Sequence, residues 1–77
     1  MSEKEKKFYR YCAGGKATTC TLTQVVNGEL VTCYVGKVRS VLCVDLNGNY
    51  KFLTKEKALQ CARDFIQRCK DRLKEVD

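Results

Sequence analysis

The sequence predicts an α+β fold: a four- to five-stranded antiparallel β-meander with one long C-terminal amphipathic helix packed on one face. Glycine and asparagine turn signals separate runs rich in valine, threonine, tyrosine and cysteine, as is typical of consecutive β-hairpins. After the last run, apolar residues recur at the three- and four-residue intervals of a helix. The chain has 77 residues, enough for one core between a sheet and a helix, so we expect residues 1–77 to form a single domain.

The N-terminal residues 1–6 are mostly charged, and a flexible arm is expected there. Residues 7–13 are expected to supply a first strand, joined to the next through a turn at Gly14-Gly15. The alternative is that these residues extend the arm. The β-meander is then assigned to residues 7–53 and the helix to residues 54–76.

The dipeptide Asn27-Gly28 predicts the central hairpin. A two-residue type I′ loop needs positive φ at both positions, which asparagine and glycine tolerate. The loop fixes which residues are opposed across the two strands: Leu22 with Cys33, Cys20 with Val35, and Gln24 with Val31. Directly opposed residues share a face of the sheet. These pairs form one mostly apolar face, which we expect the helix to cover.

The other face of the hairpin is expected to be open. It carries Thr19, Thr21, Thr23, Thr32 and Tyr34. Aromatic side chains with basic neighbours on an open sheet often hold single-stranded nucleic acid by stacking and phosphate contacts. Threonine is equally an ordinary solvent-facing strand residue, and the same face could support dimerisation.

A second turn is expected at residues 47–49, and a three-residue loop gives it the best register. That register pairs Leu46 with Tyr50 and Val44 with Phe52, and it sets Asp45 opposite Lys51. Opposite charges facing each other across two strands stabilise such a pairing.

The C-terminal helix is expected to begin at Thr54, a favourable N-cap residue, with Glu56 in the first turn where the helix dipole favours a carboxylate. Its apolar stripe is formed by Leu59, Ala62, Ile66, Cys69, Leu73 and Val76. We expect this stripe to pack on the sheet.

Six cysteines are spread along the chain: Cys12, Cys20, Cys33, Cys43, Cys61 and Cys69. The charged N-terminus lacks a hydrophobic signal segment, which favours a cytoplasmic protein whose thiols are reduced and serve as small core residues. Disulfides or redox use are the alternatives. A zinc site is a poor fit, because the chain has no histidine and no Cys-x-x-Cys pair. No metal or cofactor is therefore expected.

Catalytic motifs are missing from the sequence. Without histidine, neither a Ser/His/Asp nor a Cys/His arrangement can form, and no glycine-rich phosphate loop is present. No apolar run approaches the roughly 20 residues that span a bilayer, so a membrane partner is not expected. The sequence predicts a binding module and not an enzyme.

A net charge of +6 favours polyanions or an acidic protein surface as partners. In an up-and-down meander alternate turns share an end, so basic residues distant in sequence are expected to meet at the start of the helix. The predicted binding residues are Lys16, Lys37, Arg39, Lys55 and Lys57, with Arg10 and Tyr34 beside them. A helix N-terminus with unpaired N–H groups favours anions.

Strands followed by one C-terminal helix resemble the architecture of several small nucleic-acid-binding folds, among them PUR repeats, Whirly proteins and the arm-binding domains of phage integrases. This likeness of architecture implies nucleic-acid binding, which is the leading prediction. The alternative is a protein-interaction or inhibitor module, for example a phage-encoded inhibitor of a host or defence protein. A homodimer is compatible with both.

Overall fold

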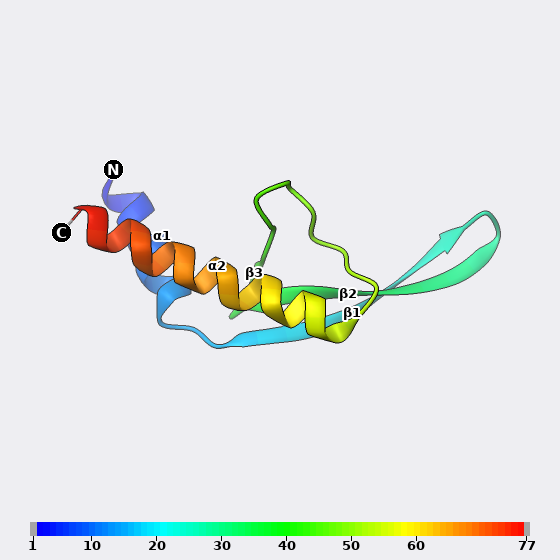
Figure 1. Cartoon of the computed structure of the whole chain (residues 1–77). Helices are drawn as coiled ribbons and strands as arrows, with labels where there is room; N and C mark the ends of the chain where they lie inside the picture. The colour runs from blue at the N-terminus through cyan, green and yellow to red at the C-terminus, as the bar shows by residue number, and fades with distance from the viewer. Residues whose placement is uncertain (1, 77) are drawn as a thin grey trace.

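The computed structural model describes residues 2–76, arranged as helix α1 (Glu3–Ala13), strands β1 (Ala17–Val26), β2 (Glu29–Val38) and β3 (Val41–Leu42), and helix α2 (Lys55–Val76). The strands form a three-stranded antiparallel sheet in the order β1-β2-β3. The molecule is elongated, measuring 49 × 21 × 20 Å, because the β1–β2 hairpin projects beyond the helices (Figure 1). The predicted α+β class with a C-terminal helix is confirmed, but the sheet has fewer strands than predicted.

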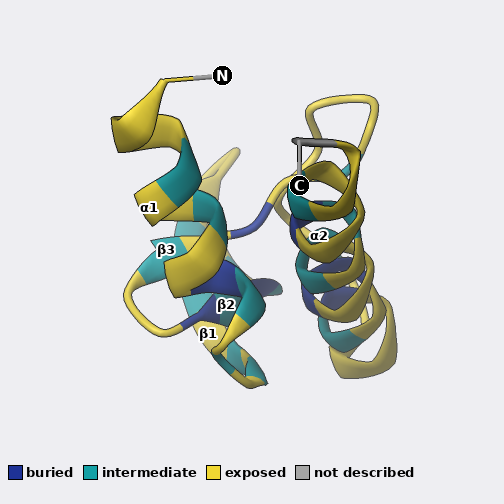
Figure 2. Ribbon diagram, turned by 90° about the vertical axis from the view of Figure 1, so that its left-hand side faces the viewer, coloured by how far each residue is buried: buried dark blue, intermediate teal, exposed yellow. Residues whose placement is uncertain are grey.

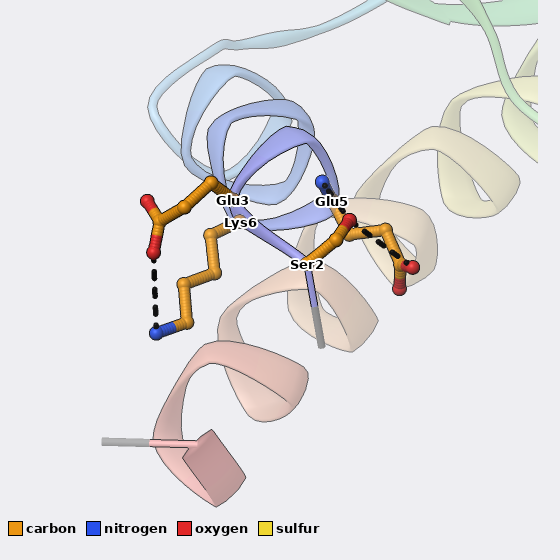
Figure 3. A network of polar contacts seen from close by, with 4 residues as sticks. All are labelled: Ser2, Glu3, Glu5 and Lys6. Carbon is orange, nitrogen blue, oxygen red and sulfur yellow. Dashed lines mark hydrogen bonds and ion pairs between the residues drawn. The ribbon is translucent and has the colours of Figure 1, made fainter.

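The N-terminal segment is helical, so the predicted strand at residues 7–13 is wrong, as is the flexible arm at residues 1–6 in its described part. Helix α1 begins with a capping interaction: the Glu5 amide donates to the Ser2 hydroxyl at 3.3 Å, and that hydroxyl lies 3.4 Å from the Glu5 carboxylate (Figure 3). The spacing Ser2-x-x-Glu5 is a capping-box sequence, which stabilises a helix start. Lys6 adds a weak surface ion pair with Glu3 at 3.9 Å.

The β1–β2 hairpin has the predicted register over its whole length, including Cys20 opposite Val35 and Leu22 opposite Cys33. Its turn has positive φ at both central residues, 52° at Asn27 and 82° at Gly28. These are the type I′ conformations that the sequence required.

The third strand is short because the chain soon leaves the sheet edge. Strand β3 pairs through Leu42 with Lys37, and the Cys43 amide still donates to the Gly36 carbonyl at 2.9 Å. Residues 44–51 then loop outward before Phe52 returns to the edge of β2. There Phe52 exchanges two backbone hydrogen bonds with Tyr34, at 2.7 and 2.8 Å.

This return of Phe52 overturns the predicted pairing of Val44 with Phe52. The loop is instead closed by Asp45, whose carboxylate accepts hydrogen bonds from the amides of Asn47 and Asn49 at 2.9 and 2.8 Å. Asp45 therefore satisfies backbone donors of its own turn, a common role for aspartate in loops, and is not opposed to Lys51 across a ladder.

Helix α2 has the predicted cap, because the Lys57 amide donates to the Thr54 hydroxyl at 3.3 Å. Its apolar side packs against the sheet and against α1, and Figure 2 shows the buried residues on that inner side. The buried core cluster is formed by small residues from every layer: Cys12, Val38, Cys43, Cys61, Ala62 and Cys69.

Candidate interaction surfaces

Helix α2 covers the threonine–tyrosine face of the sheet, which the sequence had predicted to be open. Gly36 shows this directly, because a Cβ atom there would lie 2.4 Å from the Ala58 carbonyl oxygen and 3.1 Å from the Ala62 Cβ. Side chains alternate along a strand, so Tyr34 and Val38 point to the same side as Gly36. Val38 is fully buried in the core cluster with Ala62.

The mostly apolar face therefore points away from α2, and we call it the open face. By register it includes Cys20 and Leu22 of β1, Cys33 and Val35 of β2, and Leu42 of β3. Cys33 and Val35 lie in the central strand and are 8% and 6% exposed, yet neither belongs to the core cluster beneath α2. Cys20 and Leu42 are exposed. Helix α2 does not cover the open face at Gly36, yet the central residues of that face are shielded from solvent.

The end of the hairpin forms a second uncovered surface, which we call the arm (residues 23–32). Val25 and Leu30 are directly opposed near its tip, on the same side of the sheet as Gly36 but beyond the start of α2. They are 69% and 76% exposed. The arm carries one charged residue, Glu29. An exposed β-ribbon with a single charged residue is typical of an association surface.

The predicted basic residues do not meet at one point. Arg39 lies in the β2–β3 turn with φ of 56°, and its guanidinium donates to the carbonyls of Tyr11 and Gly14 at 3.0 and 3.4 Å. It also lies 4.7 Å from the centre of the Tyr11 ring. Arg39 thus joins the C-terminal end of α1 to the sheet, a structural role that the sequence analysis missed because α1 was not predicted.

Lys55 lies away from Arg39, beside the middle of the β1–β2 hairpin, where it lines a shallow hollow with Tyr34, Thr19 and Thr21. The separation arises because α2 starts just after Phe52, which pairs with Tyr34 in the middle of β2 and not at its end. Arg39 follows Tyr34 by five positions, which correspond to about 17 Å at roughly 3.3 Å per residue of strand.

The remaining predicted residues lie on three further surfaces. Lys57 lines a small hollow with Asp45 and Asp64. Lys37 is on the open face, opposite Thr18. Lys16 follows the turn packed against Arg39, and Arg10 is in the last turn of α1.

Basic charge is instead most concentrated where the two helices meet. Residues 2–13 and 66–76 contain eight basic residues (Lys4, Lys6, Lys7, Arg10, Arg68, Lys70, Arg72 and Lys74) and four acidic ones (Glu3, Glu5, Asp71 and Glu75), a net of 8 − 4 = +4. The α1 and α2 segments pack together at this end of the molecule (Figure 1). In residues 17–36, by contrast, Glu29 is the only charged residue.

The core thiols are held in their neutral form. All six cysteines are free thiols in the structure. Burial, with smaller contributions from the nearby thiols, raises the pKa of Cys43 from its ordinary value of 9.0 to about 12. Burial likewise raises the pKa of Cys69 to about 11. Thiolates are the nucleophiles and metal ligands of cysteine chemistry, so these thiols are poorly suited to either use at neutral pH.

Among residues 2–76, no three His, Cys, Asp or Glu side chains lie close enough together to hold a metal ion. No helix in this part of the chain is long and apolar enough to cross a membrane.

No family model matches the chain, and neither the curated proteins nor the solved structures contain a significant match.

Proposed function

We propose that the chain is a small non-enzymatic protein-interaction module whose binding element is the arm. The observation that carries the proposal is the exposed Val25–Leu30 pair on a projecting hairpin, with no basic residue between positions 17 and 36. Fully burying a valine or leucine side chain stabilises a complex by about 1.5–3 kcal/mol. Two such side chains near the tip of a projecting ribbon suit an apolar groove on a partner.

The net charge of the molecule indicates which kind of partner protein would bind the arm. The arm carries only Glu29, while the chain as a whole has a net charge of +6. A positively charged body steers the molecule toward acidic surfaces and raises the association rate without entering the contact. The expected partner is a larger protein with an apolar groove and an acidic rim, which fits an inhibitor or adaptor function.

Capture of a partner from extract of the native host tests the proposal. Tagged wild-type protein, a Leu30→Lys variant and an Asn49→Lys control are compared by quantitative mass spectrometry under reducing conditions. Leu30 and Asn49 are both exposed, and each variant gains one positive charge. We expect a partner that the wild type and the Asn49→Lys control retain equally and that Leu30→Lys loses at least tenfold. Equal retention by both variants would contradict binding through the arm.

Nucleic-acid binding, the leading prediction from the sequence, is the second candidate. The net charge of +4 on the two-helix end supports it, because clustered Lys and Arg side chains release counterions from phosphates. That prediction also relied on an exposed threonine–tyrosine face. In the structure, α2 covers this face near Tyr34.

Fluorescence anisotropy with short single- and double-stranded DNA and RNA tests this second candidate. Binding through the helix end predicts an affinity that falls steeply with salt and is reduced by a Lys70→Gln/Lys74→Gln double variant. A Lys55→Gln/Lys57→Gln variant is the matched control, because it removes the same charge at the start of α2. Undetectable binding at about 50 mM salt would exclude this candidate, since phosphate contacts are strongest at low salt.

A further inference from the structure

We propose that the outer edge of β1, over residues 17–23, binds an extended acidic segment of a partner protein, which adds to the sheet as a further strand. A carboxylate of that segment pairs with Lys55 of α2. This contact goes beyond the arm, because it uses backbone groups and a lysine that the Val25–Leu30 pair does not need. Either contact can therefore be lost without the other.

The backbone groups of alternate β1 residues point away from the rest of the sheet. Tyr34 exchanges two backbone hydrogen bonds with Phe52, so its N–H and C=O point away from β1. Tyr34 is opposed to Thr21, and in an antiparallel ladder two such residues form a pair without mutual hydrogen bonds. The N–H and C=O of Thr21 therefore point to the outer edge of β1. The two-residue repeat of a strand gives Thr19 and Thr23 the same orientation.

Within residues 2–76, no strand occupies this edge and nothing in β1 protects it. β1 is the outermost strand of the sheet, and no backbone hydrogen bond from the described residues reaches its outer side (Figure 1). Proteins protect edge strands with charged residues, prolines, bulges or short length. β1 is ten residues long, contains no charged residue or proline, and pairs with β2 without a bulge. Such an edge is a template on which an extended chain forms main-chain hydrogen bonds.

Lys55 places a positive charge beside the same stretch of edge. It lines a shallow hollow with Thr19, Cys20, Thr21 and Tyr34. Thr19 and Thr21 are on the side of the sheet that faces α2, and directly opposed residues of an added strand share that side. Lys55 is exposed and makes no ion pair with another residue of the described chain. A carboxylate on the added strand supplies the complementary charge.

The charge around the edge selects an acidic segment of another protein over a second copy of this chain. Two β1 edges paired antiparallel around Thr21 would bring the Lys55 residues of both copies to one junction, in molecules that each have a net charge of +6. Like charges facing each other across strands destabilise such a pairing. An acidic segment meets the opposite sign at Lys55 and is attracted by the field of the whole chain.

NMR of the isotope-labelled full chain under reducing conditions tests the proposal with a defined probe. The probe is the end-capped peptide Thr-Val-Thr-Glu-Thr-Val-Thr, compared with the same peptide carrying lysine in place of glutamate. We expect saturable binding of the glutamate peptide with a Kd of about 0.1–1 mM, and binding of the lysine peptide that is weaker by about threefold or more. Amide hydrogen exchange of Thr21 and Thr23 should slow on binding, while that of Leu22, which faces β2, should not change.

Two pairs of variants locate the contact. Thr21→Pro removes an outward amide, which an edge strand tolerates, and should abolish binding. Thr32→Pro is the matched control, because it removes an outward amide from β2 on the opposite edge. Lys55→Glu should weaken binding of the glutamate peptide and strengthen that of the lysine peptide, by about threefold each. Lys57→Glu makes the same charge change two residues further along α2 and should alter neither Kd by more than about twofold.

No binding at about 5 mM glutamate peptide, or equal binding of the two peptides to the wild type, would overturn the proposal. If Thr21→Pro unfolds the chain, the Lys55→Glu comparison decides alone. A mass that rises to two chains in sedimentation equilibrium without peptide would show that a second copy takes the edge, and would overturn the choice of partner. The edge and the arm fail separately: Leu30→Lys should bind the glutamate peptide as the wild type does, and Lys55→Glu should still capture a partner through Leu30.

Discussion

Gly36→Ala should destabilise the protein by about 2–3 kcal/mol. The added Cβ would lie 2.4 Å from the Ala58 carbonyl oxygen and 3.1 Å from the Ala62 Cβ, so α2 must move outward by roughly 1 Å to restore ordinary contact. Overpacking of this kind typically costs about 1–3 kcal/mol. At about 0.05–0.15 kcal/mol per residue, a 77-residue chain has a free energy of unfolding of only about 4–12 kcal/mol.

The assay is urea unfolding followed by circular dichroism with reductant present. An m-value of about 1 kcal/mol/M converts the expected loss into a midpoint lower by about 2–3 M. Gly14→Ala is the control, because its Cβ would meet only ordinary contacts at 3.4 and 3.5 Å. If α2 covered the opposite face, Ala at position 36 would face outward and stabilise the strand by up to about 1 kcal/mol. A midpoint that is unchanged or raised would therefore refute the packing described above.

Three further outcomes are expected. Arg39→Ala should lower the free energy of unfolding by about 1–3 kcal/mol, measured by urea unfolding, because it removes hydrogen bonds from a charged group to the Tyr11 and Gly14 carbonyls; an unchanged midpoint would contradict this role. The free energy of unfolding should fall as pH rises above 9, by about 1.4 kcal/mol per pH unit for each thiol, because Cys43 and Cys69 ionise in the unfolded chain but stay protonated in the folded one. A free energy of unfolding that is constant from pH 9 to 10.5 would contradict this. In dilute native protein at pH 8, iodoacetamide should modify Cys20 first, and in denaturant without reductant it should modify all six cysteines, as mass spectrometry would show; fewer than six would indicate disulfides.

Local signals in the sequence were sufficient for the central hairpin and the C-terminal helix. Asn27-Gly28 allows one tight loop, and that loop determines the register of the ten-residue strands. Thr54 and the apolar spacing after it likewise predict the start and inner side of α2. Both features depend on residues close together in the chain, so no tertiary information was needed.

The face covered by α2 could not be read from hydrophobicity. The more apolar face of the hairpin is the open one, while the covered face offers Thr19, Tyr34 and Gly36 to the helix. The small size of Gly36 decides the packing, because it lets the backbone of α2 approach the sheet closely. A glycine inside a strand is a known sign of close backbone approach, and this signal was present in the sequence.

Helix α1 and the short third strand depend on contacts distant in sequence. Residues 7–13 contain aromatic residues that suit either a strand or a helix, and Cys12 is buried in a core cluster with Val38 of β2 and Cys69 of α2. Phe52 pairs with Tyr34 and not with Val44, because Asp45 closes its own loop and frees the edge of β2. Because the start of α2 and the N-terminal segment differ from the prediction, Lys55 lies far from Arg39 and the predicted basic residues are not grouped together.

An NMR nuclear Overhauser experiment on dilute, reduced protein tests most directly the claim that α2 covers one face and leaves the apolar face open. The account predicts cross-peaks from the Gly36 Hα protons to the Ala62 methyl group, and none from the Val35 methyl groups to that methyl. Cross-peaks from Val35 to Ala62, without those from Gly36, would contradict it.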